Sequence, residues 1–453
     1  MTKTLVTIGP ASANSEVITE FAKHTKLFRL NGSHNTLEWH QEIVSKVRAL
    51  VPDAFILLDI PGAKPRTSNT VPVSIKKGQT VVFGNPKIRC DDLVVGLTKP
   101  LPALDTNHMQ NFSVNDGQYL FDIVDFNSSY ITSRSRGDFI LLPKKGVNLP
   151  GSVYCETLQL QICRDFIGSV ADLDVNGFGL SFIQSGEVVD TLREIAKDRV
   201  LVSKIENSKG LKNATSIIAR SDAVMIDRGD LAAEIGFDAL YNAVERISSD
   251  TKSNGKPLIM ATENLESMAG RDTPSKSEVM SLAHSVSIGA DCIMLSEETA
   301  TADNGPYIVN WLTGFLEQAN IQVNPVKMPN QNKKYEMVWD FVSELKDASV
   351  LLMSKSGYAL FSYMAIGGGR GVSIVTNNPR ISDVAKLFSG KISVIDANLD
   401  DTVPIETIWE VVRNNQAKLF CDFDQLVAIY VSKYVNGARA NSITVFHKSD
   451  FES

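Results

Sequence analysis

Short, unbroken apolar runs recur along the first 324 residues, and stretches with helical periodicity separate them. Strands that are apolar on both faces are typical of parallel sheets covered by helices on both sides. The predicted strands are residues 4–8, 26–30, 55–59, 178–182, 200–204, 223–227, 257–261 and 291–295. Eight parallel strands with intervening helices indicate an α/β fold, a (β/α)8 barrel, although an open doubly wound sheet would give the same runs.

A long insertion interrupts this alternation between the third and fourth predicted strands. It holds short β-like runs at 71–75, 80–83, 119–124 and 140–142, which are separated by Gly, Pro, Asn and Asp residues. These runs predict a small β-barrel domain, which we interpret as a lid on the catalytic rim of the barrel. An inert decoration is the alternative.

The alternation restarts after residue 325. Strands predicted at 349–353, 372–375, 391–395 and 442–446 indicate a C-terminal α/β domain, joined by a polar segment at 325–334. We therefore expect three domains. They are a catalytic barrel of residues 1–66 and 147–324, an inserted β lid domain of residues 67–146, and a C-terminal α/β domain of effector type at 325–453.

Composition excludes several classes of protein. A chain of 453 residues that is 43% hydrophobic and 21% charged is neither disordered nor fibrous. No apolar stretch approaches the roughly 20 residues of a membrane span, and no signal peptide precedes the first strand. Lys plus Arg number 45 against 52 Asp plus Glu, without a basic block, so neither nucleic acid nor membrane is an expected partner. Five cysteines without a Cys-x-x-Cys pair indicate reduced thiols and a cytoplasmic location.

Polar residues follow the predicted strands where they end, at the rim that carries the chemistry of barrel enzymes. Lys204 and Glu206 are two residues apart, so both side chains face the barrel mouth. Asp230 follows the next strand, and with Glu206 it supplies the carboxylates that usually hold Mg²⁺. Gly229 allows close backbone approach to a ligand, and a following helix would aim N–H groups at an anion.

A second polar group follows the earlier strands. Arg29, Asn31 and Ser33 share one face by the same period of two, and an Arg fork suits a phosphoryl group. Asp59, Arg66 and Thr262 belong to the same rim. Each of these residues alone is as well explained by a helix cap or a core hydrogen bond, and their shared position favours a site.

Several segments resemble the pyruvate kinase family, in family order and over nearly the whole chain. They are 7–12 (TIGPAS), 29–31 (RLN) with 33–34 (SH), 145–151 (KGVNLPG), 203–207 (SKIEN), 228–231 (RGDL), 261–262 (AT) with 265–268 (LESM), and 289–296 (GADCIMLS). The resemblance implies phosphoryl transfer from phosphoenolpyruvate to ADP, giving pyruvate and ATP. It also implies a homotetramer and a requirement for Mg²⁺ or Mn²⁺.

The resemblance implies a role for each matching residue. The catalytic group is Lys204, Arg29, Thr262 and Arg66, and the metal ligands are Glu206 and Asp230. Substrate binding falls to Gly229, Asp230 and Thr262, where the substrate carboxylate would lie. The monovalent-cation neighbourhood is Asn31, Ser33, Asp59 and Ser181. The nucleotide side is His34, Asp116, Lys145 and Asn148, with Arg66 and Lys145 near the phosphate.

The chain also departs from the family pattern. Ile60 replaces a usual Thr, and Lys64 stands where K⁺-requiring members carry Glu and K⁺-independent members carry Lys. We therefore expect catalysis without K⁺, with Lys64 as a possible surrogate for that ion. Asp227 replaces a usual Ala beside the metal ligands, and Glu263 and Glu297 are further added carboxylates, which could weaken substrate affinity by repulsion.

The C-terminal domain carries one further candidate. The loop of Ser354, Lys355, Ser356 and Gly357 resembles the part of the family that binds a sugar-phosphate effector, but residues 358 and 359 break its later half. Two other functions stay open. One is a Mg²⁺-dependent lyase or aldolase acting on pyruvate, and the other is a catalytically weak paralogue that binds metabolites and regulates a partner.

Overall fold

The computed structural model describes residues 1–85, 91–103, 110–115, 117–324, 341–342, 344–345, 347–365, 371–390, 392–400, 402–421, 423–433 and 439–451. The predicted linker at 325–334 and the nucleotide-side Asp116 lie outside these residues. Within them, no helix is both long enough and apolar enough to cross a membrane.

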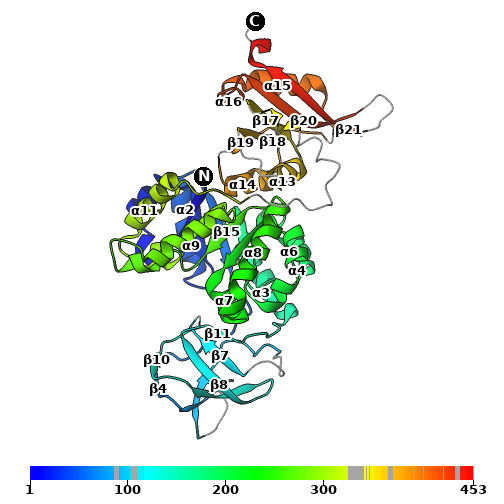
Figure 1. Ribbon diagram of the computed structural model, residues 1–453. Helices are drawn as coiled ribbons and strands as arrows, with labels where there is room; N and C mark the ends of the chain where they lie inside the picture. The colour runs from blue at the N-terminus through cyan, green and yellow to red at the C-terminus, as the bar shows by residue number, and fades with distance from the viewer. Residues whose placement is uncertain are drawn as a thin grey trace.

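A closed barrel of eight parallel strands forms the centre of the molecule (Figure 1). Its order around the ring is β1-β16-β15-β14-β13-β12-β3-β2, so β1 pairs with both β2 and β16. The strands are β1 (Lys3–Thr7), β2 (Leu27–Asn31), β3 (Phe55–Ile60), β12 (Gly177–Leu180), β13 (Val200–Lys204), β14 (Ala223–Asp227), β15 (Leu258–Ala261) and β16 (Cys292–Leu295). This closure confirms the predicted barrel and excludes the open sheet. The apolar runs become strands because both faces are covered: every residue of β3 and β13 is buried.

Helices surround the barrel and begin at residues that favour helix starts. Asn14 and Thr36 accept hydrogen bonds from the backbone at the first turns of α1 and α2, and Ser275 with Glu278 forms a capping box on α9. The helices are α1 (Ser15–Ala22), α2 (Leu37–Leu50), α3 (Glu156–Ser169), α4 (Gly186–Ala196), α5 (Ser208–Lys212), α6 (Ala214–Arg220), α7 (Arg228–Ile235), α8 (Phe237–Ser253), α9 (Lys276–Ser287), α10 (Glu297–Ala300) and α11 (Gly305–Gln318). Two short 3₁₀ turns lie at Pro10–Ser12 and Glu266–Ala269.

The inserted segment forms its own sheets at one end of the barrel, antiparallel except where β5 pairs with β6 in parallel (Figure 1). Six strands pair in the order β11-β7-β8-β9-β5-β6, and β10 pairs with β4. They are β4 (Val73–Ile75), β5 (Thr80–Gly84), β6 (Leu93–Gly96), β7 (Asn111–Val114), β8 (Tyr119–Phe126), β9 (Tyr130–Ser135), β10 (Phe139–Leu141) and β11 (Val147–Asn148). Phe83, Phe112 and Phe121 pack together in its core with ring centroids 5.0–5.2 Å apart. β11 pairs with β7 just past the predicted limit at residue 146, so the returning strand belongs to this sheet.

The C-terminal segment forms a five-stranded sheet in the order β19-β18-β17-β20-β21, in which β21 alone is antiparallel. Its elements are β17 (Ala348–Met353), α13 (Tyr358–Ala365), β18 (Val372–Val375), α14 (Pro379–Leu387), β19 (Ile392–Ile395), α15 (Ile405–Asn414), α16 (Gln416–Leu419), β20 (Gln425–Lys433), β21 (Arg439–His447) and a 3₁₀ turn at Lys448–Phe451. Strand β20 was not among the predicted strands, although its apolar run pairs with β17 at the centre of the sheet.

The C-terminal domain lies against the barrel end where the strands begin, opposite the inserted domain (Figure 1). The Cys292 thiol of β16 donates to the Leu387 carbonyl, and the Lys3 ammonium donates to the Lys386 carbonyl. Gly255 lies so close to α13 that a Cβ atom there would stand 1.7 Å from the Phe361 carbonyl oxygen. The other end of the barrel is therefore the one open to the inserted domain.

This contact predicts a stability cost for Gly255→Ala. The backbone φ of Gly255 is +64°, and the added methyl group would collide with backbone, which cannot rotate away. We expect a loss of about 3 kcal/mol in the free energy of unfolding, measured by urea titration. Gly289→Ala is the matched control, because its φ is +88° but its nearest neighbours would be at ordinary contact distance. A loss no larger than that of the control would show that the domain contact is not rigid.

Candidate active site

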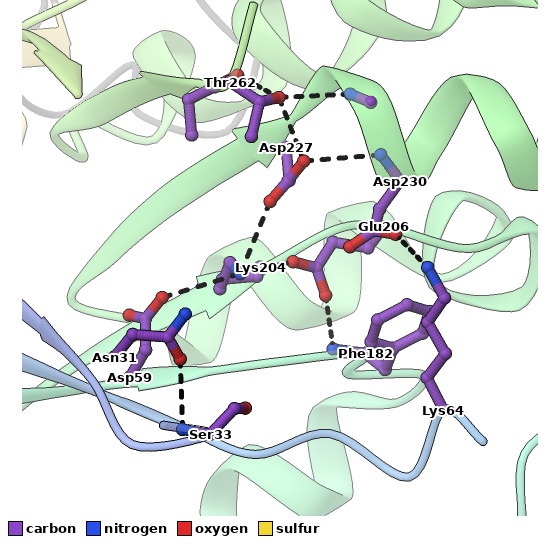
Figure 2. Close-up of polar contacts among 12 residues, drawn as sticks. Asn31, Ser33, Asp59, Lys64, Phe182, Lys204, Glu206, Asp227, Asp230 and Thr262 are labelled. Carbon is purple, nitrogen blue, oxygen red and sulfur yellow. Dashed lines mark hydrogen bonds and ion pairs between the residues drawn. The ribbon is translucent and has the colours of Figure 1, made fainter. Parts of the chain in front are cut away.

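A buried lysine lies at the centre of the polar cluster in the barrel mouth. Lys204, the last residue of β13, is 6% exposed. Its Nζ lies 2.6 Å from Glu206 Oε1 and 3.6 Å from both Asp59 Oδ2 and Asp227 Oδ2 (Figure 2). Burial alone would lower the pKa of Lys204, but these three carboxylates outweigh burial and raise the pKa above its ordinary value. The ammonium is therefore a fixed positive charge.

The backbone just after strand β12 holds the Glu206 side chain. Its Oε2 accepts a 2.8 Å hydrogen bond from the backbone N–H of Phe182, and the side chain is fully buried. Burial raises the pKa of Glu206 to about 8, although Lys204 opposes this shift. The Phe182 backbone has φ +56°, which turns its N–H toward the carboxylate.

Three carboxylates come together beside Lys204. One oxygen each of Glu206, Asp227 and Asp230 lies within 4.8 Å of the others. The sequence predicted the first and the third as metal ligands, and in the structure Asp227 lies beside them. A set of hard carboxylate oxygens at this spacing fits Mg²⁺ or Mn²⁺.

Asp227 also caps helix α7. Strand β14 ends at Asp227 and α7 begins at the next residue, so no loop separates them. Asp227 Oδ1 accepts hydrogen bonds from the Asp230 N–H at 3.3 Å and from the Thr262 hydroxyl at 3.0 Å. The Thr262 hydroxyl in turn accepts the Gly229 N–H at 3.1 Å. These contacts join all three residues predicted to bind substrate to one carboxylate.

Lys64 lies on the opposite side of the carboxylate group from the predicted monovalent-cation residues (Figure 2). Its Nζ donates to Asp230 Oδ1 at 2.5 Å and lies 5.7 Å from the centroid of the Phe182 ring. Burial would raise the pKa of Asp230, but the Lys64 ammonium outweighs burial and holds the pKa below its ordinary value. Gly146 makes room for this lysine, since a Cβ there would stand 2.9 Å from Lys64 Cε.

Arg29 and Asp59 form an ion pair from adjacent strands, with two hydrogen bonds to one carboxylate oxygen. Arg29 Nε and Nη2 donate to Asp59 Oδ2 at 3.1 and 2.7 Å. Burial would raise the pKa of Asp59, but Arg29 and Lys204 together lower it. Asp59 Oδ1 lies over Gly179, where a Cβ would stand 1.9 Å away, so glycine is required. Asn31 Oδ1 accepts the Ser33 N–H at 3.0 Å, which fixes the loop after β2.

The other predicted residues are more scattered. Asn148 reaches the site, with its Nδ2 3.5 Å from Asp230 Oδ1. Arg66 donates to the Lys144 carbonyl at 3.1 Å, on the segment that joins barrel and lid. His34 is exposed, and its pKa is lowered by partial burial and by the nearby Arg66. The Lys145 backbone donates to Thr67, and the Ser181 carbonyl accepts from Gln159, so neither bond shows a role for the side chain in the site.

Two supporting groups were not assigned from the sequence. Arg228 is buried and donates to the carbonyls of Thr262 and Glu263, which holds the loop after β15. Tyr154 donates to Glu234 Oε1 at 3.0 Å, one helical turn beyond Asp230. Arg228 stands inside the RGDL segment, where its charge was the available signal. The Tyr154 pair joins residues far apart in the chain, and no local pattern marks it.

The predicted effector loop lies at a cavity of about 560 Å³ in the C-terminal domain. Ser354, Lys355 and Ser356 line one side, while Gly357 is not among the lining residues. Asp400 and the apolar side chains of Leu399, Val403 and Ile429 line the rest. Effector binding stays a prediction.

Comparisons with known proteins agree on one family. Residues 1–309 match the family described as "Pyruvate kinase, barrel domain". The chain is 31% identical over 315 residues to the cytosolic pyruvate kinase isozyme of Nicotiana tabacum, covering 66% of this chain and 62% of that protein. It is 28% identical to the Kluyveromyces lactis pyruvate kinase, over 94% of this chain and 92% of that one.

Two further relatives match this chain over different shares of their length. The pyruvate kinase of Thermoplasma acidophilum is 30% identical over 306 residues, and the match spans 66% of this chain and about half, 54%, of that protein. The crystal structure of a pyruvate kinase from Cryptosporidium parvum superposes with a TM-score of 0.81 over 98% of this chain and 96% of that one. At 22% identity, this last similarity supports the fold alone.

The buried Glu234 predicts a pH-dependent stability difference. Burial raises the pKa of Glu234 to about 8 from an ordinary 4.5, so the folded chain holds this proton more tightly than the unfolded chain. The resulting stabilisation is present below pH 4.5 and is lost as pH rises toward 8. Glu234→Gln keeps the acceptor for Tyr154 and removes the charge. We expect the variant to gain stability relative to the native chain between pH 5 and 8, by thermal unfolding. A pH-independent difference would contradict the assignment.

Proposed function

Since the chain belongs to the pyruvate kinase family, we propose that it transfers the phosphoryl group of phosphoenolpyruvate to ADP, giving pyruvate and ATP. The observation that carries this proposal is the positively charged Lys204 beside three carboxylates whose spacing fits a divalent cation. Phosphoryl transfer needs little covalent chemistry from the protein, because positioning and charge stabilisation supply most of the catalysis.

The residues of the site divide this work. Glu206 and Asp230 would hold Mg²⁺ or Mn²⁺, which supplies positive charge to the phosphoryl and enolate oxygens when bound. Lys204 stabilises negative charge on the transferring group and on the enolate oxygen. Arg29, oriented by Asp59, keeps further N–H donors for a phosphoryl oxygen, because a guanidinium carries five.

Phosphoryl transfer forms one bond to phosphorus and breaks another. A β-phosphate oxygen of ADP attacks phosphorus, the bond from phosphorus to the enol oxygen breaks, and its electron pair forms the enolate of pyruvate. The terminal carbon then accepts a proton, and Thr262 lies near this path by resemblance. His34, Lys145 and Asn148 are proposed on the nucleotide side with Arg66. The homotetramer and the cytoplasmic location stay predictions.

Lys204→Met tests the central role. We expect formation of pyruvate from phosphoenolpyruvate, Mg²⁺ and ADP to fall at least about 100-fold, because a charge that stabilises the transition state is lost. Lys212→Met, at an exposed lysine of α5, is the matched control and should keep native activity. Absence of turnover in the native chain, with Mg²⁺ or Mn²⁺ and several diphosphates, would favour the lyase or the regulatory function.

We also propose that catalysis does not require K⁺. Ile60 is 1% exposed within the apolar core, so the predicted monovalent-cation neighbourhood lacks a hydroxyl there. The Asp59 carboxylate already faces Arg29 and Lys204, and Lys64 forms an ion pair with Asp230. Both arrangements reduce the need for a bound monovalent cation.

The K⁺ proposal is tested by rates in K⁺ and in tetramethylammonium at constant ionic strength. We expect less than about a twofold difference for the native chain, because Lys64 is a covalently attached charge. Lys64→Met should lower the rate in both salts. An activation of tenfold or more by K⁺ in the native chain would contradict the proposal.

A further inference from the structure

One carboxylate of the protein already accepts a hydrogen bond from an amide at the start of α7 and another from Thr262. Asp227 Oδ1 accepts from both the Asp230 N–H and the Thr262 hydroxyl (Figure 2). The Thr262 hydroxyl also accepts the Gly229 N–H, and its one proton is shared between Asp227 Oδ1 and the Ala261 carbonyl, which lies 2.7 Å away. This hydroxyl and both amides are therefore already hydrogen-bonded. These are the residues that the proposed function assigns to the substrate carboxylate.

The covalent geometry explains why Asp227 takes this place. The first N–H groups of a helix have no partner inside the helix and readily donate hydrogen bonds to anions. Because β14 runs directly into α7, the side chain that caps the helix comes from the last residue of a barrel strand. Asp227 is therefore directed into the barrel mouth and is 8% exposed, whereas the other two added carboxylates, Glu263 and Glu297, are exposed.

The Asp227 carboxylate also lies close to the Lys204 ammonium. Asp227 Oδ2 lies 3.6 Å from Lys204 Nζ, so the two oxygens of Asp227 face the α7 donors on one side and Lys204 on the other. A substrate carboxylate arriving here would meet both an occupied donor set and a like charge, which disfavours binding.

We propose that Asp227 is a specificity-determining residue that competes with the substrate carboxylate for the donors of α7 and Thr262. The inference rests on the proposed function, because that function places a carboxylate at these donors. A substrate binds only when the Asp227 side chain moves away, so the chain binds small carboxylates more weakly than it would with a small apolar residue at this position.

The experiment measures binding and needs no turnover. Oxalate, a small dicarboxylate, is titrated calorimetrically into the full chain at saturating Mg²⁺. We expect Asp227→Ala to bind oxalate at least tenfold more tightly than the native chain. Asp227→Asn keeps the helix cap without the charge, and its oxalate affinity should lie between those of the native chain and Asp227→Ala. Glu263→Gln is the matched control, since it removes an exposed charge at the same rim, and its affinity should stay within twofold of native.

A second titration separates competition from metal binding. Mn²⁺ affinity without oxalate should change less than threefold in Asp227→Ala. A tenfold or larger loss of Mn²⁺ affinity would show that Asp227 is a third metal ligand and would overturn the proposal. Equal or weaker oxalate binding in both Asp227 variants, or no binding by any variant, would also overturn it.

The two proposals can fail separately. Tighter oxalate binding by Asp227→Ala in a chain without phosphoryl transfer would support the competition and reject the proposed function. Unchanged oxalate affinity in a chain that makes pyruvate would reject the competition alone.

Discussion

Mutual neutralisation of buried charge is the constraint on which the site depends. Three cations, Arg29, Lys64 and Lys204, face four carboxylates, Asp59, Glu206, Asp227 and Asp230. Removing each ion from water costs several kcal/mol, so none of these groups is tolerated without partners. In the proposed function, a divalent cation would bring further positive charge to these carboxylates and to an anionic substrate.

The two added domains leave this cluster accessible for a structural reason. The C-terminal domain seals the barrel end where the strands begin, and residues of both domains share one apolar core. Strand ends at that face are buried against α14, as the bond between Cys292 and Leu387 shows. The polar cluster around Lys204 lies at the opposite rim, where the strands end. The inserted domain departs there, and the bonds between Arg66 and Lys144 and between Lys64 and Asp230 connect its base to the site.

The barrel was predictable from sequence because its strands are buried on both faces, and burial produces unbroken apolar runs such as that of β3. The positions of Lys204, Glu206 and Asp230 followed from strand ends and spacing. Asp227 was recognised as a departure, but its hydrogen bonds with the Asp230 N–H and the Thr262 hydroxyl could not be predicted. They depend on the direct join of β14 to α7 and on the left-handed backbone of Thr262 at φ +59°. The pair of Tyr154 and Glu234 depends on tertiary contact alone. Strand β20 has an apolar run that also fits a buried helix, and only its pairing distinguishes the two.

Because β14 runs directly into α7, one residue, Asp227, affects both the stability of the helix start and the binding of a ligand there. A strand that enters a helix without a loop must satisfy the first helical N–H groups from its own last side chain, from water or from a ligand. With a small apolar residue at that position, the first N–H groups would have only water or a ligand as partners. With Asp227, the Asp230 N–H already has a partner, and a ligand that uses it must replace this bond. In the proposed function, helix capping and recognition of a carboxylate are therefore not independent, because both use the Asp230 N–H.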